Sequence, residues 1–343
     1  MIQILLRMLQ RAGLAARRSQ LGGVLLFVAL FCYATSGYMY FELPDKPDLG
    51  WGDAAWWSIV TMTTVGYGDY FPQTLGGRLF VGVPTMLIGI GLLGYLLSLF
   101  AGLVMEAKMK AQKGLMPIDE AGHIIVCRYN GLGPTLKLVE EIRADATTGK
   151  RAIVLIDPHL DELPAELAAA GVRFVAGEPA REPVLEMAAF RRASYVLIQL
   201  DAHDPANSDD HNLKVALTFE RLHPEVTSIV HCKDPENIIF FKRAGCDSVV
   251  CTEALSSQMM VQEMQDPGVH AVLAELTTNA HGKQCYIVAA PAGASSFAEA
   301  RGRFADAVVL GLRRGGENLL APADATPLLP GDQIVLIASQ RPA

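Results

Sequence analysis

Two long uncharged apolar stretches occupy the first third of this chain and restrict what it can fold into. They are Leu21 to Phe41 and Leu79 to Met105, and neither contains a charged residue. A helix needs about 20 apolar residues to cross the roughly 30 Å hydrocarbon core of a bilayer, and both stretches meet this length. We therefore expect both stretches to form membrane-spanning helices.

Basic residues lie just before the first stretch and just after the second. They are Arg7, Arg11, Arg17 and Arg18 before the first, and Lys108, Lys110 and Lys113 after the second. Two spans bring these two ends of the pair to the same side of the membrane. The positive-inside rule then predicts a multi-pass protein with both termini in the cytoplasm and an outward-facing loop. A secretory signal is the weaker interpretation, because the first stretch is too long and no small-residue cleavage site follows it.

The loop between the stretches contains the sequence TTVGYGD at residues 63–69. Consecutive carbonyl groups from Thr64 to Tyr67 can replace the water around a potassium ion only if they point to one side. Such a backbone needs residues that tolerate positive φ, and Gly66 and Gly68 supply them. A glycine-rich turn in a soluble domain is the alternative, and the apolar flanks argue against it.

The residues around this motif resemble the pore of two-helix bacterial potassium channels of the proton-gated type. In AAWWSIVTMTTVGYGD, the segment from Asp53 to Met62 suits a short pore helix. The resemblance implies a potassium-binding filter, with side chains that support it and an aromatic outer mouth. These are Thr64, Val65, Gly66, Tyr67 and Gly68 for the filter, Trp56, Trp57 and Asp69 for its support, and Phe71 for the mouth.

Three further expectations follow from this resemblance. Those channels have a glutamate where this chain has Val60, so a carboxyl pair with Asp69 is not expected behind the filter. A glycine midway along the inner helix acts as the gating hinge, and Gly89 and Gly91 both lie at about that depth. The sequence shows no arginine-rich third or fourth helix of a voltage sensor, so we expect gating by something other than voltage.

Composition changes after Lys113. Residues 1–113 hold nine Lys and Arg against six Asp and Glu, whereas residues 114–343 hold twenty against thirty. This acidic balance argues against nucleic acid as a partner. We expect a pore domain at 1–113, an α/β domain at 114–266 and a small α+β domain at 267–343.

Short apolar runs alternate with helical periodicity from His123 onward, which predicts a parallel Rossmann-like sheet. The expected strands are Ile124–Cys127, Ala152–Ile156, Arg173–Ala176, Tyr195–Ile198, Ser228–His231 and Ser248–Val250, and one expected helix is Leu160–Ala170. The phrases DDHNLKVALTFERLHPEV and DPENIIFFKRAGCDSVV resemble the regulator-of-potassium-conductance (RCK) domain, of the TrkA-N type. NLLAPADATPLLPGDQIVLIAS is similar to its C-terminal partner domain, of the TrkA-C type, with a last strand at Ile334–Ala338.

The nucleotide fingerprint of a Rossmann fold is damaged in this chain. Aligned on the family, Arg128 replaces the first glycine and Asn130 the second, and only Gly133 matches. Asp157 ends the second strand, where an acidic residue would meet a ribose hydroxyl or simply form a turn. We therefore expect weak or absent NAD binding. Binding of an adenine mononucleotide stays an open alternative, because Arg128 could either pair with a phosphate or block the crevice.

A divalent cation is the other ligand class. The calcium ligands of archaeal calcium-gated relatives match Gln199, His231 and Lys233 here, so that site is not carried over. Asp201, Asp209 and Asp210 crowd the loop after the fourth strand and could hold a hard cation or cap the next helix.

These observations predict a ligand-gated potassium-selective channel in a prokaryotic inner membrane. One loop cannot surround an ion, so we expect a homotetramer in contact with lipid, whose cytoplasmic RCK ring opens the pore and could include four further soluble copies. The regulatory ligand is left open between a divalent cation and an adenine nucleotide. A non-selective cation channel and a membrane-tethered nucleotide-dependent enzyme are the alternatives, although fold alone does not imply catalysis.

Overall fold

The computed structural model describes the backbone of residues 2–342 and the side chains of residues 22–342. The four arginines of the N-terminal stretch, Arg7 to Arg18, lie outside the described side chains. The chain folds into two compact units, residues 1–109 and residues 110–343.

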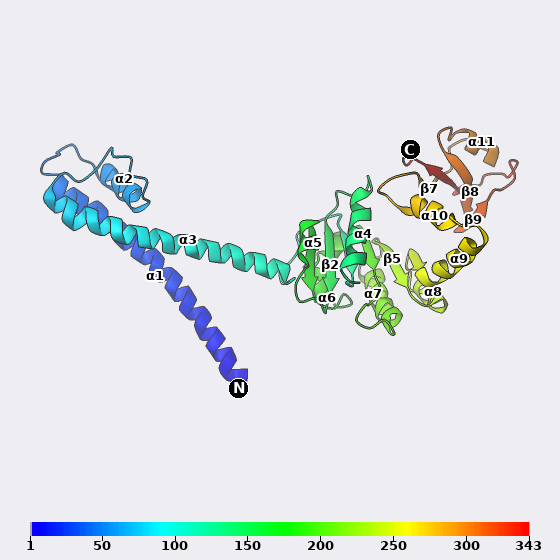
Figure 1. Cartoon of the computed structure of the whole chain (residues 1–343), viewed down its shortest axis with the longest axis horizontal. Coiled ribbons are helices and arrows are strands. Elements are labelled where there is room, and N and C mark those ends of the chain that lie inside the picture. The colour runs from blue at the N-terminus through cyan, green and yellow to red at the C-terminus, as the bar shows by residue number, and fades with distance from the viewer. Residues whose placement is uncertain (1, 343) are drawn as a thin grey trace. The chain divides into compact units, whose positions relative to one another are not determined.

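The first unit is helical (Figure 1). Its elements are α1 (Ile2–Glu42), α2 (Trp51–Met62), the π-helix η1 (Gly77–Gly82) and α3 (Val83–Gln112). Within it, Gly22–Glu42 and Gly77–Gln112 are long and apolar enough to span a membrane. These two spans match the apolar stretches predicted from the sequence, except that the first begins at Gly22 and not at Leu21, and the protein is a membrane protein.

The short helix α2 packs against α1 through a small aromatic core. Tyr38 of α1 stacks on Trp57 of α2 with ring centroids 4.5 Å apart, and Ala34 and Val81 complete the cluster. A Cβ on Gly37 would lie 2.7 Å from the Val81 side chain, so only glycine allows η1 to approach α1 this closely. The loop after α2 is therefore anchored to a packed core formed by α1, α2 and η1.

The second unit begins with a six-stranded parallel sheet in the order β3-β2-β1-β4-β5-β6. The strands are β1 (Ile124–Cys127), β2 (Ile153–Asp157), β3 (Val172–Ala176), β4 (Tyr195–Ile198), β5 (Thr227–Cys232) and β6 (Ser248–Cys251). In register, Ile124 pairs with Ile153 on one side and with Tyr195 on the other. The strand order reverses at β1 and β4, and such a switch point is where open α/β sheets bind ligands.

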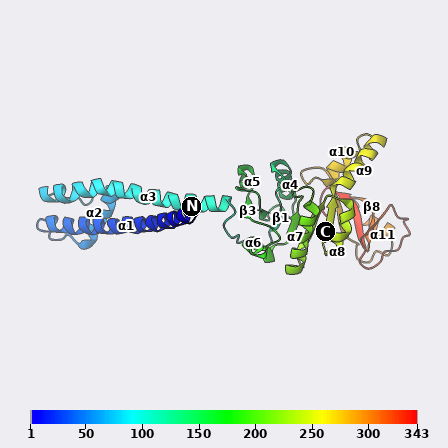
Figure 2. The same cartoon turned by 90° about the horizontal axis from the view of Figure 1, so that it is seen from below.

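Helices cover both faces of this sheet (Figure 2). The elements are α4 (Leu132–Ala144), α5 (Ala165–Ala169), α6 (Glu182–Met187), η2 (Phe190–Arg192), α7 (Ser208–Leu222), η3 (Pro235–Asn237), α8 (Ile238–Arg243) and α9 (Thr252–Gln265). Val139 of α4 and Leu167 of α5 pack on one face, while Leu185 of α6, Phe219 of α7 and Phe241 of α8 pack on the other. The parallel α/β domain predicted from the sequence is confirmed.

One expected helix was wrong in its length. The helix predicted at Leu160–Ala170 begins only at Ala165. Before it, the backbone N–H groups of His159 and Leu160 donate to the Asp157 carboxylate at 2.8 Å each. The N–H of Leu163 donates to the carbonyl of Gln112 at 2.9 Å. These N–H groups have partners outside a helix, so the segment forms a turn.

The C-terminal part contains α10 (Val269–Thr277), β7 (Gln284–Ala289), α11 (Phe297–Gly302), β8 (Val308–Arg314), β9 (Glu317–Leu320) and β10 (Gln333–Ala338). The four strands form an antiparallel sheet in the order β7-β10-β8-β9. Arg314 pairs with the buried Asp332 at 2.7 Å, and Asp332 also accepts the N–H of Leu329. This pair fixes the turn that leads into β10, and the small α+β domain is as predicted.

Candidate functional site

The filter loop follows α2 with a backbone that alternates in handedness. φ is positive at Thr64 (63°), Gly66 (59°) and Gly68 (78°) and negative at the residues between them. Gly66 and Gly68 adopt these values without steric penalty. At Thr64 the left-handed backbone costs roughly 1–2 kcal/mol, because it carries a Cβ.

Hydrogen bonds to the end of α2 orient the carbonyl groups of this loop. The N–H groups of Val65 and Gly66 both approach the carbonyl oxygen of Val60, at 3.0 and 3.4 Å. In a trans peptide unit the N–H and C=O point in opposite directions. The carbonyls of Thr64 and Val65 therefore point away from the end of α2.

Two aromatic side chains of α2 hold the loop and its surroundings. Trp56 donates from Nε1 to Oδ2 of Asp69 at 2.8 Å and stacks on Tyr67 with centroids 5.9 Å apart. Trp57 is buried and stacks on Tyr38 of α1. Within the chain, Trp56 thus contacts Tyr67 and Asp69 of the predicted filter segment, and Trp57 packs α2 against α1.

The end of α1 carries a buried carboxylate that was not predicted from the sequence. Glu42 is fully buried and accepts hydrogen bonds from the backbone N–H groups of Gln73 and Thr74, at 2.9 and 3.0 Å. The Thr74 hydroxyl also donates to it at 2.8 Å. Glu42 is the first charge after the uncharged stretch from Leu21 to Phe41, and this position was the only signal in the sequence.

Phe71 lies in the segment after the filter and is 46% exposed. Its carbonyl accepts a hydrogen bond from the hydroxyl of Tyr38 at 3.3 Å. The ammonium group of Lys46 lies 5.7 Å from the centroid of the Phe71 ring, within the range of a cation–π contact. A cation of the chain itself already uses one face of this ring.

The two glycines considered as hinges differ in their surroundings within α3. A Cβ on Gly89 would lie 3.1 Å from the Cα of Met62, the last residue of α2, whereas a Cβ on Gly91 would meet nothing within 4 Å. Gly89 is therefore a point of close helix packing, and Gly91 lies in open space. Their hinge role stays a prediction.

At the switch point, Arg128 follows β1 with φ of 77° and is buried. Its Nη2 lies 2.8 Å from Oε1 of Glu178 and its Nη1 lies 3.3 Å from Oδ2 of Asp201. Asp157 is also buried, and it accepts the N–H of Tyr129 in addition to those of His159 and Leu160. Gly133 lies in the first turn of α4, with open space around it. Arg128 and Asp157 thus already have partners within the chain.

The three candidate metal ligands have separate environments. Asp201 is buried beside Arg128 and lies 3.1 Å from Nδ1 of His211. Asp209 accepts the N–H groups of Lys233 and Asp234 at 2.8 and 2.9 Å, while Asp210 is exposed. In the described part of the chain, no group of three or more His, Cys, Asp or Glu side chains is arranged to hold a metal ion.

Hydrogen bonds keep both buried aspartates ionised. Burial opposes the charge of Asp201, but the His211 hydrogen bond and the Arg128 guanidinium together hold its pKa below the usual value. Burial likewise opposes the charge of Asp209, and the Asn237 amide and the N–H groups of Lys233 and Asp234 lower its pKa. These carboxylates act as internal hydrogen-bond acceptors that join β4 and β5 to α7.

Comparison with known protein families divides the chain into three segments. Residues 25–106 match the ion-channel family, and residues 124–252 match the TrkA-N domain. Residues 253–343 match the family described as Castor and Pollux, part of voltage-gated ion channel.

Related proteins cover the chain to different extents. An uncharacterized protein of Methanothermus fervidus is 28% identical over 238 residues, which are 67% of this chain and 34% of that protein. Probable potassium channel protein 2 of Methanocaldococcus jannaschii is 26% identical over 307 residues, which are 84% of this chain and 85% of that protein. The solved GsuK channel is 20% identical with a TM-score of 0.46, and the match covers 92% of this chain and 56% of that one.

The chain thus spans about a third of the first relative and most of the second. It carries an ion-channel segment followed by a TrkA-N domain, and over 84% of its length it is similar to a probable potassium channel of a prokaryote.

Proposed function

We propose that this protein is a potassium-selective channel whose pore opens when a ligand acts on its RCK module. The observation that carries the proposal is the filter backbone, in which φ alternates in sign from Thr64 to Gly68 and the carbonyls of Thr64 and Val65 point away from α2. Four such loops around one axis provide the rings of carbonyl oxygens that replace the hydration shell of potassium.

The direct test is ion selectivity in planar bilayers. Purified channel between potassium and sodium solutions should give a reversal potential close to that of potassium. Equal permeabilities would replace the proposal by its rival, a non-selective cation channel of the same build.

Hydrogen bonds attach the last residues of α3 to the TrkA-N domain. The Gln112 carbonyl accepts the N–H of Leu163 at 2.9 Å, and the Gly114 carbonyl accepts the N–H of Ala176 at 3.0 Å. A shift of β3 therefore moves the end of α3 with it. A ligand can open the pore by this route only if it binds one arrangement of the module more tightly than the other.

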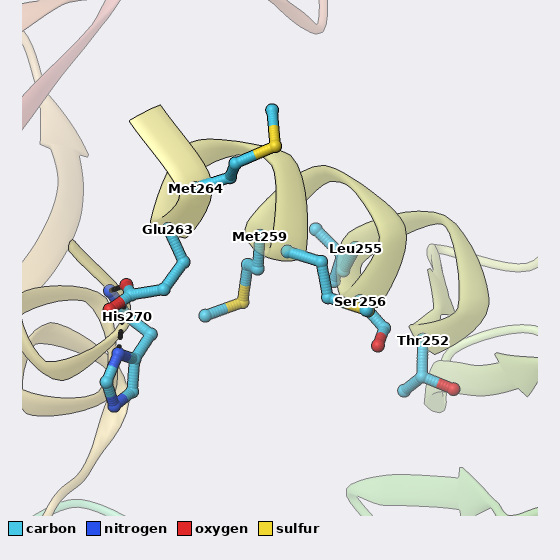
Figure 3. Close-up of a pocket in the computed structure, with 8 residues that line it drawn as sticks. Thr252, Leu255, Ser256, Met259, Glu263, Met264 and His270 are labelled. Carbon is cyan, nitrogen blue, oxygen red and sulfur yellow. Dashed lines mark hydrogen bonds and ion pairs between the residues drawn. The ribbon is translucent and has the colours of Figure 1, made fainter. Parts of the chain in front are cut away.

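Assembly is part of the proposal. Four apolar side chains of α9 are exposed: Leu255, Met260, Val261 and Met264. Figure 3 shows the adjoining groove, where Met259 and Leu255 lie on one side of α9 and Glu263 pairs with His270. An apolar surface of this kind is covered in a soluble domain by a partner. We propose that a second copy of the module covers this apolar surface of α9 within a ring. Light scattering of the channel in detergent should give the mass of a tetramer, or of a tetramer with four additional RCK modules if soluble copies join.

The regulatory ligand is proposed to be a divalent cation or an adenine nucleotide. A ligand that binds only the folded protein raises its unfolding temperature. Thermal unfolding of the purified channel with calcium, magnesium, ADP, ATP and NAD should identify one compound that both stabilises the protein and changes its open probability. We propose no catalysis, and turnover of any nucleotide by the purified channel would support the enzyme alternative.

The proposed location is the prokaryotic inner membrane with both termini in the cytoplasm. The basic residues that follow the second span, Lys108, Lys110 and Lys113, support this orientation. Protease added to spheroplasts should leave the RCK module intact and should cleave it after the membrane is opened.

A further inference from the structure

We infer that Arg128 fills, from within the chain, the place at the switch point where the pyrophosphate of a dinucleotide would lie, so that the TrkA-N domain of this protein excludes NAD and related dinucleotides. The inference concerns binding to this domain and does not depend on the proposed channel activity. Four features of the structure carry it: the position of Arg128, its partners, the hydrogen bonds of Asp157, and the charge of the switch point.

The position of Arg128 is that of the first fingerprint glycine. It follows directly after β1, and its φ of 77° is the left-handed backbone that glycine adopts freely. In a dinucleotide-binding fold the loop before the next helix stays free of side chains, so that its backbone can approach the pyrophosphate. Here a long cationic side chain starts from that loop and is only 3% exposed.

The partners of Arg128 come from the two sides of the switch point. Glu178 follows β3, and both of its carboxylate oxygens contact the guanidinium, at 2.8 and 3.4 Å. Asp201 follows β4 and lies 3.3 Å from Nη1. A bidentate pair of this kind is among the strongest polar contacts in proteins. The guanidinium therefore joins chain segments that a dinucleotide would have to separate.

The carboxylate that would bind a ribose already accepts three backbone hydrogen bonds. Oδ1 of Asp157 accepts from the N–H groups of His159 and Leu160, and Oδ2 accepts from the N–H of Tyr129 at 2.9 Å. Tyr129 belongs to the fingerprint loop, so an N–H that could face a phosphate is used as well. A ribose hydroxyl would have to reach a carboxylate that is 1% exposed and compete with these three hydrogen bonds, and displacing one would leave a buried N–H unpaired.

The charge of the switch point also disfavours phosphate. Two carboxylates, Glu178 and Asp201, contact the one guanidinium, and the buried carboxylate of Asp157 accepts the N–H of the adjoining residue Tyr129. Their formal sum is negative, and a pyrophosphate would bring further negative charge into a poorly hydrated place. The chain supplies the cation that a phosphate would need, but that cation is already paired with the chain's own carboxylates.

The test compares nucleotide binding to the full-length channel before and after this internal pair is removed. Arg128→Gly restores the fingerprint glycine but removes the guanidinium partner of Glu178 and Asp201, which destabilises a buried site. The decisive variant is therefore Arg128→Gly with Glu178→Gln and Asp201→Asn. Arg192→Gly is the matched control, because Arg192 also pairs with one carboxylate, Asp119 at 2.8 Å, away from the switch point.

Equilibrium dialysis with labelled NAD and labelled ADP gives the dissociation constants, and circular dichroism and tetramer mass report folding. We expect no saturable NAD binding to the unmodified channel or to Arg192→Gly, and saturable NAD binding to the triple variant. A folded triple variant that still ignores NAD would overturn the inference. So would saturable micromolar NAD binding by the unmodified channel, a measurement that requires no variant to fold.

Discussion

The carboxylate of Glu42, at the end of the outer helix, lies 2.8 Å from the hydroxyl of Thr74, in the segment that returns from the filter. The same carboxylate accepts the backbone N–H groups of Gln73 and Thr74. This one side chain therefore fixes the chain on the outer side of the filter, while Trp56 and Asp69 fix the filter itself. The relationship gives the first of five predictions.

Glu42→Ala should destabilise the assembled channel. The variant loses three hydrogen bonds to a buried charge and leaves two backbone N–H groups unpaired, and each such bond contributes about 1.5–3 kcal/mol. Thermal dissociation of the tetramer, followed by size-exclusion chromatography, measures the effect. Asp48→Ala is the control, because Asp48 is an exposed carboxylate in the next loop. Equal stability of the two variants would show that the Glu42 contacts do not matter.

Gly66→Ala should abolish selectivity for potassium over sodium. Gly66 has φ of 59°, and a Cβ disfavours this backbone, so the carbonyl of Val65 would leave its position. Reversal potentials in mixed potassium and sodium solutions measure the change. Gly52→Ala is the control, because Gly52 is helical and a Cβ there meets nothing within 4 Å. Retained selectivity in Gly66→Ala would remove the filter from its proposed role.

Phe71→Val should weaken external block by tetraethylammonium, which binds aromatic faces through cation–π contacts. The structure adds an opposite expectation for Lys46, whose ammonium lies 5.7 Å from the Phe71 ring. Lys46→Met removes this competing cation and should strengthen block. The two variants should thus change the blocking concentration in opposite directions. Identical block in all three proteins would show that the Phe71 ring does not line the outer mouth.

Gly114→Ala should uncouple the RCK module from the pore. Gly114 has φ of 65°, and an added Cβ would lie 2.3 Å from the backbone nitrogen of Ala176, which donates to the Gly114 carbonyl. We expect normal potassium selectivity with a reduced response to the regulatory ligand, as in a chain that ends near Lys113. Gly302→Ala, at a position with open space and an ordinary backbone, is the control. A truncated channel that still responds would place the sensor in the membrane part.

The Asp201 pair should make stability depend on pH. The pKa of Asp201 is lowered in the folded protein, so its contribution is present above the unfolded value of about 4 and is lost as pH falls through the lower folded value. The unfolding temperature should therefore fall less between pH 5 and pH 3 in Asp201→Asn than in the unmodified channel. Asp161→Asn, at an exposed position, should keep the original profile. Parallel profiles for all three would contradict the role of the pair.

The sequence alone determined the membrane spans, the filter motif and most strands of the RCK module. Two of those strands, Ile124–Cys127 and Tyr195–Ile198, have the predicted boundaries. These features depend on residues close together in the chain: a run of apolar side chains, glycines at fixed positions, and a strand-length alternation with helices. Each of these signals lies within a short stretch of the chain, so it can be recognised before the fold is known.

Only the tertiary structure decided which partners the charged and aromatic side chains take. Arg128 pairs with Glu178 and Asp201, which follow other strands of the sheet, and Glu42 binds a turn on the far side of the filter loop. The sequence could not distinguish an arginine that awaits a phosphate from one already paired, because both have the same local surroundings. Likewise, Asp157 was compatible with a ribose or a turn, and its direction was fixed only when β1 and β2 came together in the sheet. Burial makes these long-range pairings obligatory, since a buried charge without a partner is strongly unfavourable.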